Sequence, residues 1–157
     1  MGSSRKGKSG IEMNSKNIET PTEIKSLSNI EQISCGRDFC LSIDSNNQVY
    51  SWGDNNFGQL GESEDFMLET PKRIRFFKDK NIVKISSGEN FSLALSQNGE
   101  VYSWGINSDG QLGHGHKSDV NIPNKINLNF KVSDIGCGNS HSLLLSGKFG
   151  NSKLNLL

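Results

Sequence analysis

The string V-Y-S-W-G-x-N-x-x-G-Q-L-G occurs twice in this chain, at Val49–Gly61 and at Val101–Gly113, and the two copies are 52 positions apart. A fixed period of this length is typical of stacked or radial supersecondary units and not of one closed domain. It constrains the fold strongly, because each unit of a repeat protein must bury its faces against its neighbours.

A second pattern precedes each aromatic segment and has a third copy near the C-terminus. Its copies begin at Ile33, Ile85 and Ile135, and a Pro-x-x-Ile step precedes each one, starting at Pro21, Pro71 and Pro123. Apolar and small residues alternate with a period of two within this pattern, as a half-buried strand requires.

The segment Gln97–Gly99 separates two such runs. Asn-Gly is a strong hairpin signal, because both residues of the turn must tolerate positive φ. No stretch shows helical periodicity over three turns, so the sequence predicts an all-β fold. Each unit should contain a short strand into a glycine corner, an alternating strand, a tight turn and an aromatic strand.

The repeated motif residues are predicted to be structural, because they recur at identical positions of the repeat. Glycines mark strand ends where the backbone bends or is approached closely, Gln59–Gly61 is predicted to be a brief inward strand, and the tryptophans are predicted to anchor the core. A ligand groove lined by the tryptophans is the weaker alternative. The motif residues are Trp52, Gly53, Gly58, Leu60 and Gly61, and Trp104, Gly105, Gly110, Leu112 and Gly113.

These motifs resemble the repeats of the regulator of chromosome condensation (RCC1) family, whose hallmark string is followed by a G-x-x-H-S-x-x-L strand. The resemblance covers residues 18–147 and implies four-stranded antiparallel blades of a seven-bladed β-propeller. This chain carries about three blades, which make an incomplete ring. After Leu145 the family pattern calls for another V-Y-x-W-G strand, which residues 146–157 do not match.

The sequence therefore suggests three regions. Residues 1–17 are expected to be a flexible basic tail, residues 18–147 the RCC1-like repeats, and residues 148–157 a divergent C-terminal tail. The repeats divide into a partial unit at 18–48 and full units at 49–100 and 101–147. Because about three blades cannot close the ring, we expect, in order of preference, a short product of a longer propeller gene, an excised fragment, or a small protein that completes itself by self-association through its open edges.

Composition excludes several classes of function. There are 17 basic and 17 acidic residues, so no global field favours nucleic acid or an acidic membrane. No apolar run approaches the roughly 20 residues of a membrane span, and no signal-peptide core is present, so a cytoplasmic or nuclear location is expected. The three cysteines form no C-x-x-C pair and are expected to be reduced thiols.

Two motifs suggest ligands, but their context argues against that reading. Gly2–Ser9 satisfies the P-loop pattern, yet no strand can precede it, so nucleotide binding is not expected. His114 and His116 form a His-x-His pair without an identifiable third ligand. We therefore expect no metal and no cofactor.

No catalytic constellation emerges, so function is assigned to the loops that differ between copies. The candidate partner-binding residues are Glu62, Glu64, Phe66, Met67, His114 and His116. Whether Phe66 and Met67 face a partner or pack on the next blade stays open. The predicted function is a protein-interaction module, and the alternative that the family resemblance implies is guanine-nucleotide exchange on a Ran-like small GTPase by a longer, full-length form of the protein.

Overall fold

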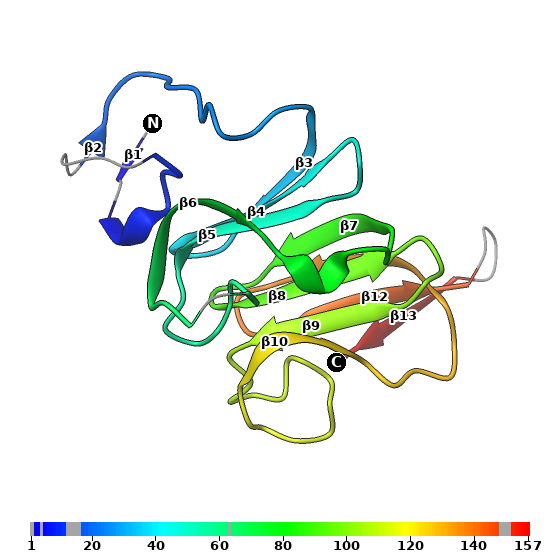
Figure 1. Ribbon diagram of the computed structural model, residues 1–157. Helices are drawn as coiled ribbons and strands as arrows, with labels where there is room; N and C mark the ends of the chain where they lie inside the picture. Colours follow the sequence, from blue (N-terminus) through cyan, green and yellow to red (C-terminus); the bar gives the residue numbers. More distant parts are fainter. Residues whose placement is uncertain (1, 4, 12–16, 63, 148–151) are drawn as a thin grey trace.

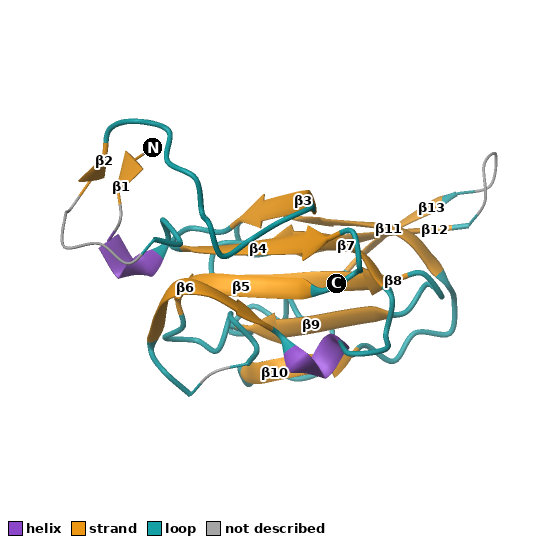
Figure 2. Ribbon diagram, turned by 45° about the horizontal axis from the view of Figure 1, so that its top comes forward, coloured by secondary structure: helices purple, strands orange, loops and turns teal. Residues whose placement is uncertain are grey.

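The computed structural model describes residues 2–3, 5–11, 17–62, 64–147 and 152–157. These residues form small antiparallel sheets that stand side by side (Figure 1). Two single turns of 3-10 helix, η1 (Arg5–Gly7) and η2 (Arg75–Phe77), are the only helical elements in this part of the chain. The prediction of an all-β fold is confirmed (Figure 2).

Three of the sheets are successive blades, each built from consecutive strands. Blade one contains β3 (Ile30–Cys35), β4 (Phe39–Asp44), β5 (Val49–Asp54) and β6 (Met67–Arg73). Blade two contains β7 (Ile82–Ser87), β8 (Phe91–Ser96), β9 (Val101–Gly105) and β10 (Val120–Lys125). Blade three contains β11 (Val132–Cys137), β12 (Ser142–Ser146) and β13 (Lys153–Leu156).

Blades one and two have the expected four strands, whereas blade three has three in the described part of the chain. Its third strand, β13, pairs with β12 through Leu145↔Leu154 and Leu143↔Leu156. The aromatic strand β9 occupies the corresponding place in blade two, where Leu95 pairs with Val101. The segment without the V-Y-x-W-G string thus takes the position of the aromatic strand.

The middle strand of blade two is buried on both faces, not on one as the alternation suggested. All six residues of β8 are buried, including Ser92 and Ser96, because blades one and three cover its opposite faces. Buried hydroxyls are tolerated when they are hydrogen-bonded, and Ser92 Oγ donates to the Gln59 carbonyl of blade one (3.0 Å).

The predicted hairpin after β8 is confirmed, but its turn differs in type. The Ser96 amide donates to the Glu100 carbonyl (2.9 Å), so three residues form the loop. Of these only Gly99 has positive φ (76°). A three-residue loop that ends in a left-handed glycine therefore replaces the expected pair of positive-φ residues.

The outer strand of each full blade contains the proline that the sequence suggested was a lead-in to the next unit. Pro71 lies in β6 and Pro123 lies in β10. Proline is tolerated in edge strands because it cannot donate to a ladder. Gln59–Gly61 forms a turn and not the expected strand, although Leu60 is fully buried.

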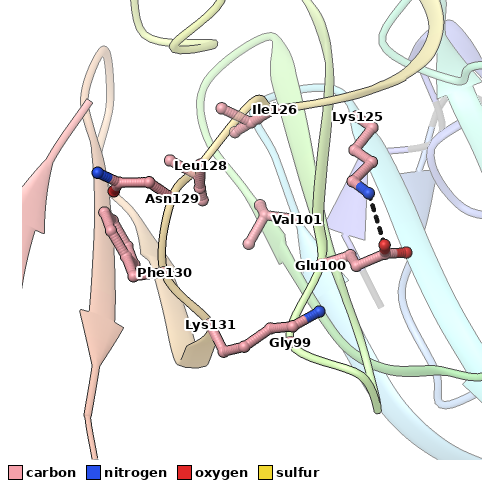
Figure 3. Close-up of a pocket in the computed structure, with 9 residues that line it drawn as sticks. All are labelled: Gly99, Glu100, Val101, Lys125, Ile126, Leu128, Asn129, Phe130 and Lys131. Carbon is pink, nitrogen blue, oxygen red and sulfur yellow. Dashed lines mark hydrogen bonds and ion pairs between the residues drawn. The ribbon is translucent and has the colours of Figure 1, made fainter.

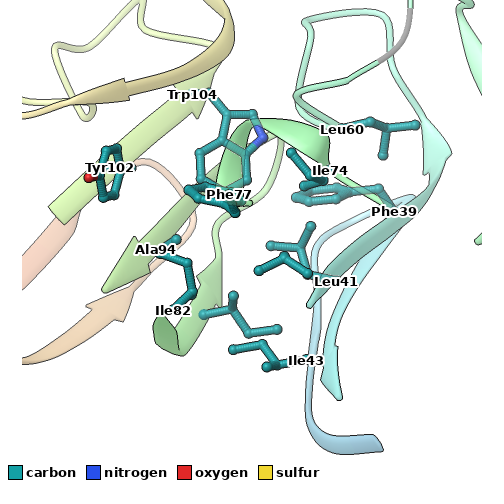
Figure 4. Packing of buried hydrophobic residues seen from close by; sticks show 12 residues of the cluster. Phe39, Leu41, Ile43, Leu60, Ile74, Phe77, Ile82, Ala94, Tyr102 and Trp104 are labelled. Carbon is teal, nitrogen blue, oxygen red and sulfur yellow. The ribbon is translucent and has the colours of Figure 1, made fainter. Parts of the chain in front are cut away.

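Apolar side chains fill the spaces between blades. One cluster joins blades one and two, and Figure 4 shows Phe39 and Leu41 of blade one facing Ile82, Ala94 and Trp104 of blade two. A second cluster joins blades two and three. Each blade is therefore stabilised mainly by its neighbours, as in other repeat architectures.

A two-stranded sheet lies beside blade one at the N-terminal end of the chain. It pairs β1 (Gly2–Ser3) with β2 (Asn17–Ile18), and Gly2 lies opposite Ile18. The Lys8 side chain forms an ion pair with Asp38 of blade one (2.7 Å), so the described part of the expected basic tail contacts the sheet.

Candidate protein-interaction site

The hallmark turn that follows each aromatic strand is held by its own polar side chains. Asn55 Oδ1 accepts a hydrogen bond from the Leu60 amide (3.0 Å), and Asn107 Oδ1 accepts one from the Leu112 amide (3.0 Å). Trp104 of blade two donates its indole N–H to the Gln59 carbonyl (2.8 Å). Hallmark residues therefore fix the turn and attach it to the next blade.

Close contact with the next blade explains why the turn needs glycine. Gly58 has φ of 73°, and a Cβ there would lie 2.5 Å from Asn121 Cα of β10. A Cβ on Gly61 would lie 2.7 Å from the indole nitrogen of Trp104. Both the dihedral angle and the proximity exclude a side chain.

Three of the predicted partner-binding residues lie in the loop between Gly61 and β6, a fourth is the first residue of β6, and the four have different environments. Glu62 Oε2 accepts a hydrogen bond from the Arg75 amide (2.7 Å), which ties this side chain to the blade. Glu64 is exposed, Phe66 is 77% exposed, and Met67 is 40% exposed at the start of β6. Phe66 does not pack into the next blade.

A pocket of about 460 Å³ lies at this end of the strands, between the loop of blade one and the outer strand of blade two. Glu62, Glu64 and Phe66 line it from blade one, and Asn121 and Ile122 line it from blade two. Ile122 is 63% exposed. An exposed aromatic ring, an exposed isoleucine and a carboxylate thus converge across a junction between blades, as they do in many protein-binding surfaces.

The histidines of blade two lie in the equivalent loop and not in this pocket. Their rings are stacked with centroids 5.8 Å apart. Ser103 Oγ donates to the Leu112 carbonyl (2.7 Å), so the nearby His114 Nε2 (2.9 Å) acts as the donor to that hydroxyl. Burial lowers the pKa of His114. His116 accepts a hydrogen bond from the Ser118 amide (3.2 Å).

Sequence reasoning missed Asn121 and Ile122, because they belong to the next repeat and reach the pocket only through the packing of blades. A weak signal was present, since Ile122 is apolar where the preceding copy has the polar Thr70. Exposed apolar residues on an outer strand are otherwise unremarkable.

A second pocket of about 350 Å³ lies at the opposite ends of the strands (Figure 3). Val101, Ile126 and Phe130 contribute apolar surface, and an ion pair between Lys125 and Glu100 (2.5 Å) lies at its margin. Lys125 and Tyr102 both hydrogen-bond to Glu100 and hold the pKa of its carboxyl group below its usual range.

Two features are absent from the described residues. No group of three or more histidine, cysteine, aspartate or glutamate side chains among them is placed to hold a metal ion. Within the same residues no helix is long and apolar enough to cross a membrane.

Comparison with known proteins explains the repeats. A family model described as "Regulator of chromosome condensation (RCC1) repeat" matches residues 46–95 and 98–145, which are more than half of the chain. A second model of the same description matches residues 30–59 and 82–111. The chain belongs to the RCC1 repeat family. The recognition made from the hallmark strings is confirmed.

Relatives of this RCC1 repeat chain include large proteins with other parts. The human E3 ubiquitin-protein ligase HERC2 is 39% identical over 108 residues, which are 68% of this chain and 2% of that protein. The Arabidopsis thaliana ultraviolet-B receptor UVR8 is 34% identical over 139 residues, which are 85% of this chain and 31% of that protein. The chain therefore spans less than a third of the length of these two relatives.

Solved structures confirm the propeller-type fold. Prp20p from Saccharomyces cerevisiae, described together with its binding to Gsp1p and histones, matches with a TM-score of 0.78 and 25% identity, over 97% of this chain and 39% of that one. Yeast RCC1 (Prp20) bound to Kap60 matches with a TM-score of 0.74 and 26% identity, over 93% and 38%. The described residues form about three blades of the propeller, and these blades do not close into a ring.

Proposed function

We propose that this chain is a protein-interaction module that binds its partner at the pocket between blades one and two. The observation that carries the proposal is the pair of exposed apolar side chains, Phe66 and Ile122, which line one pocket from two different blades. An exposed aromatic anchor in a concave site is the usual centre of a protein interface. No catalytic role is assigned to any residue.

The charge of the pocket indicates the kind of partner. Glu64 is exposed at its edge, while the carboxylate of Glu62 is already committed to Arg75. We therefore expect a protein segment that inserts an apolar side chain and places a lysine or arginine next to it. Complementary charge at the rim mainly affects the association rate and the specificity.

Selection from a displayed library of random peptides tests this proposal. Peptides selected by the native chain should carry an apolar residue beside a basic one, and Phe66→Ser or Ile122→Ser should weaken their binding about tenfold or more, the effect expected of a central anchor. Lys117→Ser, in the equivalent loop of blade two, is the control. Selected peptides that bind native chain and both pocket variants equally would refute this location.

A second candidate is guanine-nucleotide exchange on a Ran-like small GTPase, supported by the likeness to Prp20p, which binds Gsp1p. The chain spans 39% of that structure, so exchange is the less favoured function. Release of a fluorescent guanine nucleotide from a purified GTPase measures it directly. Acceleration by the native chain would establish exchange, and an unchanged rate would leave the interaction module alone. Both functions fit a protein of the cytoplasm or nucleus, which imaging of a tagged chain would test.

A further inference from the structure

Residues Gly7–Gly10 form a hallmark turn, although they share only the two glycines with the hallmark sequence G-Q-L-G. Gly7 and Gly10 have φ of 70° and 71°, and Gly58 and Gly61 have φ of 73° and 72°. The Gly10 amide donates to the Gly7 carbonyl (3.0 Å), as the Gly61 amide does to the Gly58 carbonyl (3.0 Å). Residues Gly7–Gly10, which overlap the P-loop-like sequence, are thus a degenerate copy of G-Q-L-G.

This turn attaches to blade one in the way that the blade-one turn attaches to blade two. Trp52 donates its indole N–H to the Lys8 carbonyl (3.1 Å), matching the bond from Trp104 to Gln59 (2.8 Å). A Cβ on Gly7 would lie 2.5 Å from the Leu68 carbonyl oxygen of β6. The N-terminal segment therefore occupies the place of a preceding blade.

The strand pairing assigns the rest of that blade. Gly2 pairs with Ile18 as Gly53 pairs with Leu68, so β1 continues an aromatic strand and β2 begins an outer strand. Pro21 then follows β2, in the order seen in β6. We call β1, the turn and residues 17–24 the half-blade. Among the described residues this sheet contains only β1 and β2 and lacks the set of three inner strands found in a blade.

A hollow marks the place where those inner strands would pack. It measures about 510 Å³ and is lined by apolar side chains that include Ile18, Ile24, Ile33 and Trp52. Ile33 is 73% exposed, whereas Ile85 and Ile135, at the same position of the other blades, are 5% exposed. Blade one thus exposes a face that the other two blades bury.

Blade three has the opposite deficit. It has three inner strands, and Leu154 of β13 is 68% exposed where Val49 and Val101 are 1% and 0% exposed. A Cβ on Gly110 would meet no atom within 4 Å, although the equivalent Gly7 and Gly58 are covered by the outer strand of the next blade. The described residues include no outer strand of blade three, which is the element that would cover Gly110 by analogy with β10 over Gly58.

We propose that the half-blade of one copy completes blade three of a second copy of this chain. The first supplies the hallmark turn and the outer strand, the second supplies the three inner strands, and neither part is duplicated. Such pairing removes two exposed sheet edges, which proteins otherwise have to protect. This inference does not depend on the function proposed for the pocket between blades one and two.

The repeat fixes the register of the joint. The Ile74 amide donates to the Val49 carbonyl (2.8 Å) and the Ile126 amide to the Val101 carbonyl (2.9 Å). By the same register, the Ile24 amide of one copy is expected to donate to the Leu154 carbonyl of the other. The pair Ser51↔Lys72 likewise predicts Thr22 beside Leu156.

Two such joints close the assembly. Each copy carries one half-blade and one blade three, so a pair of copies can form two such joints. The expected mass in solution is twice 17.3 kDa. A mass of 17.3 kDa at every concentration in sedimentation equilibrium would overturn the proposal.

A charge in the hollow should break the joint without affecting the single copy. Ile33→Glu places a carboxylate on an exposed position of one copy and should raise the dimer dissociation constant about tenfold or more, because the joint buries it. Val83→Glu is the matched control, since the equivalent residue of blade one is already Glu31. Equal dissociation constants for the two variants would count against the hollow.

Substitution of Gly110 tests the joint, because an effect on association could not arise from contacts within a single copy. Gly110→Ala should weaken association, while Gly115→Ala should not, although both glycines have φ near 80° (82° and 78°) and neither has a neighbour within one copy. Far-UV circular dichroism checks that both variants fold. Equal association of the two would refute the assigned contact.

Cross-linking locates the joint. In a Cys35→Ser, Cys40→Ser background, which reproduces Ser87 and Ser92 of blade two, a Thr22→Cys copy mixed with a Leu156→Cys copy should form a heterodimeric disulfide under oxidation. Each variant alone should not. A larger mass that is insensitive to Ile33→Glu and gives no such cross-link would show association elsewhere and reject the proposal.

Discussion

Single residues of the hallmark string stabilise the junction between blades through close backbone approach and backbone hydrogen bonds. Gly58 lets the Asn121 backbone approach, and the Gln59 carbonyl receives both the Trp104 indole and the Ser92 hydroxyl. The contact between blades at this point therefore depends on the absence of a side chain at Gly58 and on the position of the Gln59 carbonyl. Lys8 offers its carbonyl to Trp52 in the same way, whereas the buried Gln59 side chain also accepts a hydrogen bond from the Phe57 amide (2.9 Å) and donates one to Asp54 (3.1 Å).

Gly58→Ala should therefore destabilise the fold more than Gly115→Ala. Both substitutions force a left-handed alanine, which costs about 1 kcal/mol, but only at Gly58 would the Cβ also collide with a neighbouring strand, 2.5 Å away. Urea unfolding should show a lower free energy of unfolding for Gly58→Ala, by about 1–3 kcal/mol relative to Gly115→Ala. Equal values would mean that the blades separate before the turn is strained.

His114 predicts a pH dependence of stability. Its pKa is lowered in the fold by burial, so between the folded and the unfolded pKa the unfolded chain binds more protons. Its contribution is complete above the unfolded pKa of about 6.5 and is lost as the pH falls through the folded pKa. Urea unfolding between pH 8 and pH 5 should follow this trend.

The control for that measurement is His114→Gln, which does not titrate and whose longer amide side chain can reach the position of Nε2 to donate to Ser103. This variant should show a flatter pH profile over the same range. An unchanged profile would assign the dependence to other groups.

At the scale of elements, the outer strands and turns carry the contacts between blades. Much of this could be predicted from the sequence: the two hallmark strings predicted the aromatic strands, and the alternating runs predicted the strands before them. The outer strands were missed, because proline and polar residues in β6 and β10 resemble a loop and only the pairing with β5 and β9 reveals a strand.

The half-blade and β13 were also not recognisable, for a related reason. Residues 2–10 keep only the spacing of the hallmark glycines, since the turn requires backbone conformation and not side chains. In β13 leucines replace the aromatic string, and Leu157 lies against Gly113 where Trp104 lies against Gly61. Burial against a neighbouring blade tolerates many apolar residues, so pattern matching fails there. The pocket residue Ile122 escaped prediction because it comes from another blade.

The two tryptophans test how much each junction contributes. Trp104→Phe should lower the free energy of unfolding by about 2–4 kcal/mol, because it leaves a cavity in a closed core and removes one of the two hydrogen bonds to the Gln59 carbonyl. Trp52→Phe should cost less, about 1 kcal/mol, because Trp52 borders the half-blade and its hollow. Circular dichroism during urea unfolding gives both values, and a larger loss at Trp52 would contradict this ranking.

At the scale of the whole molecule, stability and exposure depend on which faces find a neighbour. Blade two is covered on both sides, whereas blades one and three each expose one apolar face. Nearest-neighbour interfaces dominate the stability of repeat proteins, so the outer blades are the least stable parts of a single copy.

The alkylation rates of the thiols should show which faces of the blades are covered. Cys35 lies in the hollow and is exposed, and the hydrogen bond from Cys40 lowers its pKa, while burial raises the pKa of Cys137. Alkylation at neutral pH should therefore modify Cys35 first, and its rate should rise several-fold on dilution as the joint in the hollow opens. Cys35→Ser identifies the signal, and a rate independent of protein concentration would argue against coverage of the hollow.

Gly2 and Leu157 hold the repeat positions of Gly53 and Trp104, that is, neighbouring places in one pattern. A gene in which the codon for Gly2 directly followed that for Leu157 would thus encode an array without a seam or a linker. The number of blades in such a concatemer would be set by how many coding units are joined, which makes the chain a modular part for building propellers of chosen size.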